Sequence, residues 1–222
     1  MRAFLLAAGK GERLRPLTDS IPKPLLSLAG EPLIVHHIKR LVSIGITDIV
    51  INVSHHAKQI TNYLGDGKQW GAHLVYSYEP TALETGGGIT QALPLLGNEP
   101  FLVISGDIFT DFPFSNLLFS LKKSAHLVLS SHPDCHPDFH LEGNQIKTSG
   151  MPKYTYGNIG LYHPRLFASH TPHAFKLIDV LLPEIKAGNV TGELYEGLWE
   201  NITSQKQYET LKEKYRNYRY PE

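Results

Sequence analysis

The stretch EPLIVHHIKRLVSIGITDIVINV, residues 31–53, places a helical pattern directly before a strand pattern. In its first half, Ile34, Ile38 and Leu41 recur at helical spacing, and Pro32 suits the first turn of a helix. The second half ends in DIVINV, a run typical of a strand that is buried on both faces. A helix that leads into a buried strand is the crossover of a parallel β–α–β unit, so the stretch predicts an α/β fold.

The same alternation continues on both sides of this stretch. Further strand-like runs are AFLLAA (residues 3–8), HLVYSY (73–78), FLVIS (101–105) and HLVLSS (126–131), a second helix is expected over residues 57–64, and the Pro-, Gly- and His-rich region 131–157 is expected to form a hairpin or a lid over the sheet edge. We therefore expect a Rossmann-like, mostly parallel sheet with helices on both faces. No internal repeat or linker divides the chain, so residues 1–222 are expected to form a single domain.

The C-terminal stretch SQKQYETLKEKYRNYRY, residues 204–220, carries an aromatic stripe. Tyr208, Leu211, Tyr215 and Tyr218 recur at helical spacing, and charged residues fill the other positions. The pattern predicts a terminal helix that docks by its aromatic face.

Composition excludes several classes of protein. Lys and Arg number 21 and Asp and Glu number 21, so the formal net charge is +0, and neither nucleic acid nor a membrane surface is expected as a partner. Cys135 is the only cysteine, which excludes an internal disulfide and fits a reducing compartment. The first apolar run stops at Gly9, too early for a signal peptide, so we expect a soluble cytoplasmic protein. Nothing in the sequence indicates an oligomeric state.

The loop after the first strand has the composition of a phosphate site. In LLAAGKGERLRPLTDSIPKPL, residues 5–25, Gly9 and Gly11 resemble the start of a dinucleotide fingerprint, but a leucine takes the third glycine position, and the Gly-Lys-Ser/Thr order of a P-loop is absent. What remains is a glycine turn whose backbone N–H groups can approach phosphate oxygens. Arg13 follows as a forked cation, and two prolines hold Lys23. The loop predicts binding of a phosphorylated ligand at the carboxyl ends of the strands.

Longer motifs indicate a family. LAAGKGERLRPLT followed by PKPLLSLAGEPLI resembles the G-x-G-x-R and P-K-P-L signature of the sugar-1-phosphate nucleotidylyltransferases, which have a Rossmann-like α/β fold. LETGGGITQALPLLG, ISGD, YGNIGLY and GLWENIT follow in the family's order. The short length, LETGGG and the absence of an appended β-helix domain are most similar to the group that uridylylates N-acetylmuramate α-1-phosphate in peptidoglycan recycling.

The resemblance implies a reaction and a nucleotide site. The phosphate of a sugar 1-phosphate attacks the α-phosphorus of a nucleoside triphosphate, here UTP, and pyrophosphate leaves; no protein nucleophile is needed. By family position, the nucleotide-binding residues are Ala8, Gly9, Gly11, Glu12, Arg13, Lys23, Gly86 and Gly87. Arg13 would steady the pyrophosphate, Lys23 would reach the α-phosphate, and Gly86 and Gly87 would form the wall against base and ribose.

The resemblance also implies Mg²⁺. Asp107 follows the FLVIS strand, where a carboxylate suits this ion, and it is expected to be catalytic as the principal metal ligand. The family's W-x-D-x-G-T stretch is WENITS here, so Asn201 takes the position of the second metal ligand and offers a neutral carbonyl oxygen.

The sugar side of the site is expected in the second half of the chain. Asp138, in the PDF of HPDCHPDFH, matches a turn of the muramate-type relatives, and Asn158 and Gly160 belong to YGNIGLY; these three are the expected substrate-binding residues. The His and Cys residues of 132–140 are expected to form a loop and not a zinc site, because two prolines break any helical spacing.

Three alternatives remain open at this point. One is a mannose-1-phosphate guanylyltransferase. Another is a catalytically silent nucleotide-binding regulatory protein, because Asn201 and Thr203 depart from the family's pattern. The third is a glycosyltransferase of the related nucleotide-sugar fold, which is disfavoured because Asp107 and Asp111 are too far apart for a D-x-D motif.

Overall fold

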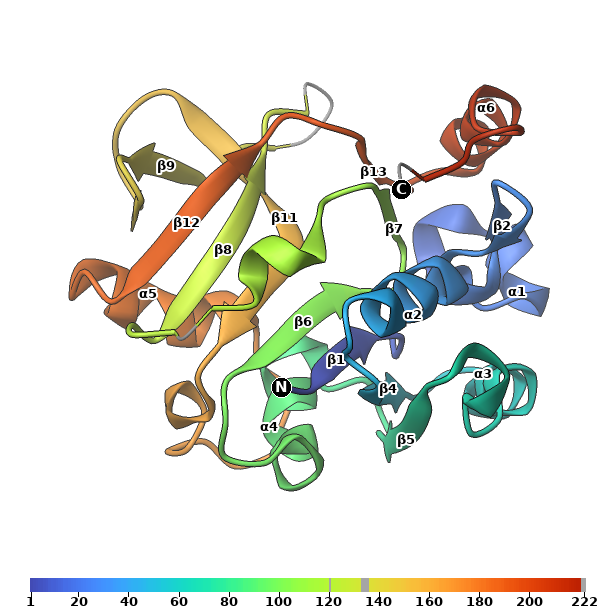
Figure 1. Cartoon of the computed structure of the whole chain (residues 1–222), viewed down its shortest axis with the longest axis horizontal. Helices are drawn as coiled ribbons and strands as arrows, with labels where there is room; N and C mark the ends of the chain where they lie inside the picture. The colour runs from blue at the N-terminus through green and yellow to red at the C-terminus, as the bar shows by residue number, and fades with distance from the viewer. Residues whose placement is uncertain (120, 133–135, 221–222) are drawn as a thin grey trace.

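In the part of the chain that the structure describes, nine strands form one mixed sheet, and helices pack on both of its faces (Figure 1). The structure is a computed structural model, and it describes residues 1–119, 121–132 and 136–220. The strands of the sheet, in spatial order, are β5 (His73–Tyr78), β4 (Asp48–Val53), β1 (Ala3–Leu6), β6 (Phe101–Ser105), β11 (Lys153–Tyr162), β8 (Ala125–Ser130), β12 (Val190–Tyr195), β10 (Gln145–Lys147) and β9 (Phe139–Glu142). Two short ladders lie outside it, β2 (Ser27–Leu28) with β3 (Glu31–Pro32) and β7 (Ile108–Thr110) with β13 (Trp199–Asn201). The α-helices are α1 (Leu17–Ser20), α2 (Leu33–Ser43), α3 (Ala57–Leu64), α4 (Glu84–Leu96), α5 (Leu177–Lys186) and α6 (Gln205–Lys214).

The first half of the chain is the parallel sheet that the sequence predicts. β5, β4, β1 and β6 are all parallel, with Ala3 of β1 opposite Ile49 on one side and Leu102 on the other. Three of the predicted strands, residues 48–53, 73–78 and 101–105, have the expected bounds, and α3 covers the predicted residues 57–64.

The second half corrects the prediction of a mostly parallel sheet. β11 is antiparallel to both β6 and β8, and β10 is antiparallel to β12 and β9, so the sheet as a whole is mixed. The predicted hairpin in region 131–157 exists as β9 and β10, but it is part of the sheet, because β9 also pairs with the start of β11. A bulge between Tyr156 and Ile159 bends β11, and this bend lets one strand pair with β9 at its start and with β6 at its end. The last five strands of the order therefore close into a ring.

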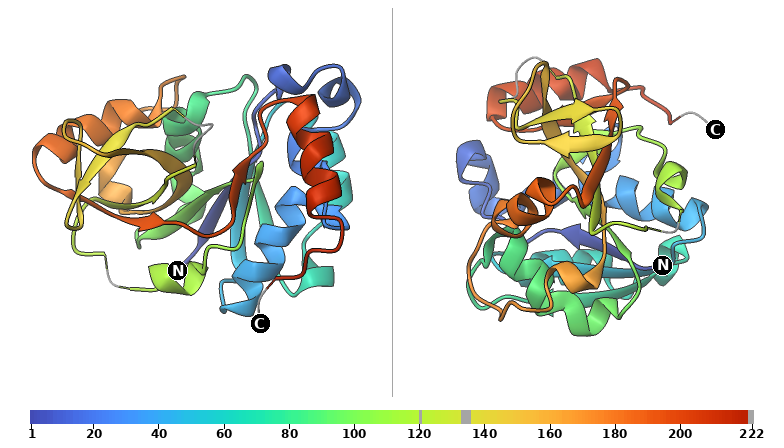
Figure 2. Two further views of the ribbon diagram at one scale, coloured as in Figure 1. Left: turned by 90° about the horizontal axis from the view of Figure 1, so that it is seen from above. Right: turned by 90° about the vertical axis from the view of Figure 1, so that its left-hand side faces the viewer.

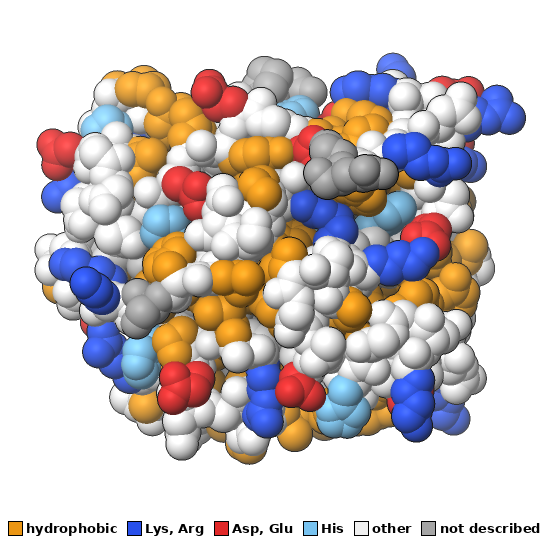
Figure 3. Space-filling view, in the orientation of Figure 1, with side chains coloured by type: hydrophobic (Ala, Val, Ile, Leu, Met, Phe, Trp, Pro, Cys, Tyr) orange, Lys and Arg blue, Asp and Glu red, His pale blue; other side chains and the backbone are white. Residues whose placement is uncertain are grey.

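Side chains of β1 alternate between two apolar layers. Leu5 belongs to the core under α2 and α3, whereas Phe4 belongs to the core under α4 and α5. The predicted placement of helices on both faces is therefore confirmed, and Figure 2 shows the two layers on opposite sides of the sheet. Among the helices of the described residues, none has the length and apolar character needed to cross a membrane. On the face drawn in Figure 3, acidic and basic side chains are interspersed, as expected of a chain with equal numbers of both.

The C-terminal segment packs on the β7–β13 ladder by its aromatic side chains. Tyr208, Leu211 and Tyr215 are buried in a third core cluster together with Phe109 of β7, and Tyr218 packs against the same cluster. The predicted docking face of the terminal helix is thus confirmed for α6, although the helix itself ends at Lys214.

Candidate active site

A cavity of about 760 Å³ opens at the carboxyl ends of the parallel strands. The described residues that line it are 6–14, Lys23, Pro24, Asn52, Glu79, Ala82, Glu84, Thr85, Ser105 and Asp107. Ligand sites of α/β sheets lie at this edge, so the cavity is where the fold predicts a ligand.

The two glycines of the first loop are glycines for different reasons. Gly11 has a φ of 65°, and a Cβ there would lie 2.9 Å from Cγ2 of Thr18, whose hydroxyl donates a hydrogen bond of 2.8 Å to the Gly11 carbonyl. Gly11 is therefore required by the turn itself. A Cβ on Gly9 would meet no atom within 4 Å, so the turn does not require this glycine. Gly9 lines the cavity, and its bare backbone leaves room for a ligand to come close.

Lys23 and Asp107 form an ion pair in the wall of the cavity. Lys23 lies in a 3₁₀ turn (Lys23–Leu25) and is buried, and its Nζ is 2.5 Å from Oδ2 of Asp107. The second carboxylate oxygen of Asp107 accepts a hydrogen bond of 2.6 Å from the Ser105 hydroxyl. Burial alone would raise the pKa of Asp107, but the attraction of Lys23 and these hydrogen bonds outweigh burial and hold that pKa below its ordinary value. The carboxylate is therefore ionised at neutral pH.

The remaining predicted residues of the loop line the same cavity. Arg13 is exposed and, among the described residues, its guanidinium has neither a hydrogen-bond nor an ion-pair partner. Glu12 is also exposed and lies 3.9 Å from the Lys10 ammonium. The structure thus brings together Ala8, Gly9, Gly11, Glu12, Arg13, Lys23 and Asp107, all of which the sequence singles out.

The structure places Gly86 and Gly87 in the first turn of α4, against a distant segment of the chain. Neither is among the described residues that line the cavity. A Cβ on Gly86 would lie 2.3 Å from the Phe175 ring, and a Cβ on Gly87 would lie 2.0 Å from the His173 carbonyl oxygen. Both backbone N–H groups donate to the Phe175 carbonyl, at 3.1 and 3.3 Å. Close packing against residues 173–175 therefore requires glycine at both positions, and their contact with the nucleotide stays a prediction.

Asn52 and Glu79 are cavity residues that the sequence analysis missed. The Ala7 N–H donates to Oδ1 of Asn52, and Nδ2 of Asn52 donates to Oε1 of Glu79, each at 2.7 Å. The other oxygen of Glu79 accepts the Leu83 N–H at 2.9 Å. Burial raises the pKa of Glu79, against the effect of these hydrogen bonds. This relay joins the ends of β1, β4 and β5 to the start of α4. A polar residue at the end of an apolar strand was the available signal.

The three expected sugar-side residues lie together along β11, outside the residues that line the cavity. Asp138 accepts the Tyr156 N–H at 2.8 Å through one carboxylate oxygen. Asn158 lies in the bulge of β11 with a φ of 57°. A Cβ on Gly160 would be 2.8 Å from the Tyr162 ring, so internal packing requires this glycine.

Asn201 lies on β13 in register with Ile108, the residue that follows Asp107. It does not line the cavity, and its side chain makes no hydrogen bond with the described residues. A carboxylate such as that of Asp107, just before β7, and an amide oxygen such as that of Asn201, on the neighbouring β13, are ligand types that suit Mg²⁺, which takes few protein ligands and fills its shell with phosphate and water. No cluster of three or more His, Cys, Asp or Glu side chains in the described part of the chain could hold a metal ion.

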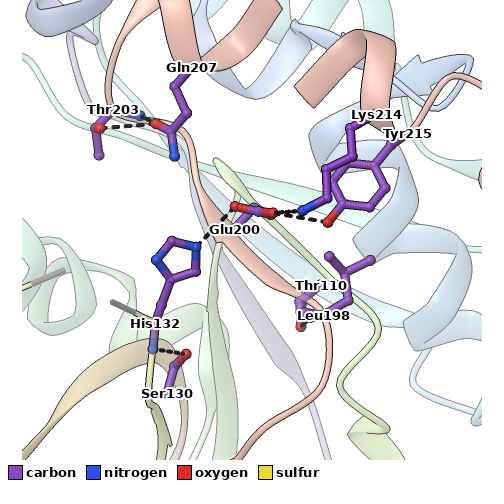
Figure 4. A network of polar contacts seen from close by, with 9 residues as sticks. All are labelled: Thr110, Ser130, His132, Leu198, Glu200, Thr203, Gln207, Lys214 and Tyr215. Atoms are coloured by element: carbon purple, nitrogen blue, oxygen red, sulfur yellow. Dashed lines mark hydrogen bonds and ion pairs between the residues drawn. The ribbon is translucent and has the colours of Figure 1, made fainter. Parts of the chain in front are cut away.

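The strand that carries Asn201 is fixed by its neighbour Glu200 (Figure 4). Oε1 of this buried carboxylate accepts hydrogen bonds from Lys214 and Tyr215, both at 2.9 Å, and Oε2 lies 3.2 Å from Nε2 of His132. On the other side, the Trp199 indole donates to the Gly157 carbonyl at 2.7 Å. His132 thus has a structural partner, and Cys135 lies outside the described residues.

Comparisons with known proteins indicate the family of the chain. The sequence profile of the nucleotidyl transferase family matches residues 2–134. The chain is 43% identical over 214 residues to an N-acetylmuramate alpha-1-phosphate uridylyltransferase of Neisseria meningitidis, covering 91% of this chain and 93% of that protein. It is 40% identical over 121 residues to a mannose-1-phosphate guanyltransferase of Gibberella zeae, covering 53% of this chain and 33% of that protein.

A solved structure supports the fold. A candidate glucose-1-phosphate thymidylyltransferase from Bacillus anthracis, in complex with sucrose, superposes with a TM-score of 0.86 and covers 100% of this chain and 98% of that one, at 22% identity. Fold, profile and sequence identity lead to one conclusion. The chain belongs to the nucleotidyl transferase family.

Proposed function

We propose that this enzyme transfers the uridylyl group of UTP to N-acetylmuramate α-1-phosphate in a Mg²⁺-dependent reaction that releases pyrophosphate, with residues 1–222 acting as one nucleotidyltransferase domain. One observation carries the reaction class: the glycine loop, the unpartnered Arg13 and the Lys23–Asp107 pair all line one cavity at the strand ends. The Neisseria relative supports the substrates, because its similarity covers nearly the whole of both chains. We place the reaction in the cytoplasm, as a step of peptidoglycan recycling.

The residues that line the cavity neutralise the charge of the phosphates and hold the substrates in position. An oxygen of the sugar phosphate is already an anion at neutral pH, so its attack on the α-phosphorus needs no general base. The new bond joins that oxygen to the α-phosphorus, and the bond to the β-phosphate oxygen breaks. Backbone N–H groups near Gly9 hold the triphosphate, and Lys23, which lines the same cavity, stabilises charge on the transferring phosphate. Arg13 binds the departing pyrophosphate.

Asp107 and Asn201 are the residues that would hold Mg²⁺. When bound, the ion would supply neutralisation of the triphosphate charge. Asp107 is suited to this role because it is ionised at neutral pH. Asp138, Asn158 and Gly160 are proposed to contact the sugar, and Asp138 keeps one carboxylate oxygen outside its hydrogen bond to Tyr156.

The test is a matrix of nucleoside triphosphates against sugar 1-phosphates, with pyrophosphate release as the readout. UTP with N-acetylmuramate α-1-phosphate should give the largest kcat/KM, and omission of Mg²⁺ should abolish turnover. Faster turnover of GTP with mannose 1-phosphate would overturn the proposed substrates, but the proposed reaction class, nucleotidyl transfer, would still hold. That second function is supported by the match to the guanyltransferase, which spans about half of this chain and a third of that protein.

A further inference from the structure

Glu84 has an unfavourable backbone conformation at the start of α4. Its φ is 59°, in the left-handed region where the Cβ of an L-residue is crowded and glycine is preferred. In the described part of the chain, four residues other than glycine have a positive φ: Ala29, His56, Glu84 and Asn158. Of these four, Glu84 is the one that lines the cavity.

The folded chain does not use the Glu84 side chain. It is exposed, and its carboxylate forms no hydrogen bond or ion pair with any described residue. The first turn of α4 is satisfied in another way, because the Phe175 carbonyl accepts both N–H groups of Gly86 and Gly87. Strained backbone that persists without a structural use is concentrated at functional sites.

The charges of the cavity indicate what this carboxylate can bind. Arg13 and Lys23 supply cations beside the glycine loop, which suits phosphate. Each of the other acidic groups in the wall already has a partner. Asp107 is paired with Lys23, and Glu12 lies 3.9 Å from the Lys10 ammonium. Both oxygens of Glu79 accept hydrogen bonds, from Asn52 and from the Leu83 N–H. The Glu84 carboxylate would repel phosphate, and it can accept hydrogen bonds from neutral donors. The neutral donors of a nucleotide are the ribose hydroxyls and the N–H groups of the base.

We propose that Glu84 is a specificity-determining residue whose carboxylate accepts hydrogen bonds from the nucleoside half of the triphosphate. The proposal rests on the proposed function and adds a role for a residue at which glycine would be the conformationally favoured choice. It predicts that the strained backbone at residue 84 is retained because the side chain recognises the nucleotide. Removal of the side chain should therefore raise the stability of the protein and lower its selectivity for the nucleotide.

The test compares Glu84→Gly with the matched control Ala29→Gly, which removes a strained side chain in the β2–β3 turn, away from the cavity. Glu84→Gly should raise the Tm by about 2–4 °C, as expected for relief of backbone strain in a chain of this size. Its kcat/KM for UTP should fall on the order of tenfold or more through KM, the loss expected when a hydrogen bond to a charged group is removed. Ala29→Gly should leave the kinetic constants unchanged.

Two further nucleotides identify the donor. If Glu84 binds the ribose, wild type should prefer UTP to dUTP, and Glu84→Gly should lose that preference. If it binds the base, Glu84→Gly should lose the preference for UTP over CTP, which lacks the N3–H of uracil. Equal kinetic constants of wild type and Glu84→Gly for UTP, dUTP and CTP would overturn the proposal.

Failure of the proposed function can be recognised separately. If no sugar 1-phosphate supports turnover of UTP, calorimetric binding of UTP, dUTP and CTP to the same proteins tests Glu84 without catalysis. If GTP is the substrate, the series becomes GTP, dGTP and ITP, which lacks the exocyclic amine of guanine. In each series an affinity that does not respond to Glu84→Gly counts against the proposal.

Discussion

At the scale of single residues, Gly11 is required by the fold, whereas Gly9 is expected to be required by the ligand. Gly9→Ala places a methyl group in open space, so the free energy of unfolding should stay within about 1 kcal/mol of wild type. The same methyl group faces the cavity, and kcat/KM should fall about 100-fold if a triphosphate lies against this backbone. Thermal unfolding and pyrophosphate release measure the two effects.

Gly11→Ala is the matched comparison for this prediction. It combines a φ of 65° with a 2.9 Å approach to Thr18, so it should be destabilised by about 1–2 kcal/mol or more. A Gly9→Ala enzyme with normal kinetic constants would show that no ligand approaches Gly9.

The buried carboxylate of Asp107 predicts a pH dependence of stability. Its pKa in the folded protein is below the ordinary value near 4 of an unfolded chain. Its contribution is therefore present above about pH 4 and is lost as the pH falls through the lower, folded pKa. Denaturant unfolding of wild type between pH 5 and 2.5 should show a steeper loss of stability than that of Asp107→Asn. Asp19→Asn, which removes an exposed carboxylate paired with Arg15, should retain the wild-type slope. Identical slopes for wild type and Asp107→Asn would contradict the depressed pKa.

The sequence located the charged loop residues because their signals are local. Gly9, Arg13 and Lys23 follow a strand within one short stretch, and the strand end determines where they lie. The close contact of Gly86 with Phe175 could not be predicted, because Phe175 is 89 residues away and belongs to no motif that involves the helix. A glycine in a sequence can indicate that another group packs closely against the backbone, but it does not identify that group.

At the scale of elements, the relay through Asn52 joins three strand ends. Asn52→Ala removes the acceptor of the Ala7 N–H and the donor to Oε1 of Glu79. Both groups lie in a buried region, so the free energy of unfolding should fall by about 2 kcal/mol. Urea denaturation measures this loss. The control is Asn62→Ala on the exposed face of α3, where stability should stay the same or rise slightly. A loss below about 0.5 kcal/mol for Asn52→Ala would mean that the relay does not hold these strands.

The bounds of the strands were predicted far better than the pairing between strands. The apolar runs of β4, β5 and β6 are long and bounded by polar residues, which is why their limits agree with the sequence analysis. The order of the second half depends on the bulge in β11, which lets one strand pair with three others. Pairing of that kind leaves no periodic pattern in the sequence, and the prediction of a mostly parallel sheet was wrong for this reason.

At the scale of the whole molecule, the C-terminal segment holds the strand that carries Asn201. Glu200→Ala removes a buried carboxylate that links β13, α6 and His132, and it should destabilise the protein by about 2–3 kcal/mol. Because Asn201 is the next residue, the Mg²⁺ concentration for half-maximal pyrophosphate release should also rise. Glu209→Ala removes an exposed ion pair on the same helix and should change stability by less than about 1 kcal/mol. An unchanged Mg²⁺ requirement in Glu200→Ala would show that the position of β13 does not affect the proposed metal site.

The ion pair between Lys23 and Asp107 has a consequence for the order of events in the reaction cycle. A protein that already satisfies its reactive carboxylate with its own ammonium group offers little to a bare divalent cation, which would have to displace that group unaided. If Asp107 holds Mg²⁺, a nucleotide would supply phosphates that attract the ammonium group together with the cation that the carboxylate would hold instead, and both would favour the exchange of partners. We therefore expect Asp107 to bind the metal only together with nucleotide. Calorimetric titration of Mg²⁺ into the nucleotide-free protein should give almost no heat, whereas the same titration in the presence of a non-hydrolysable UTP analogue should saturate; tight binding without nucleotide would contradict this order.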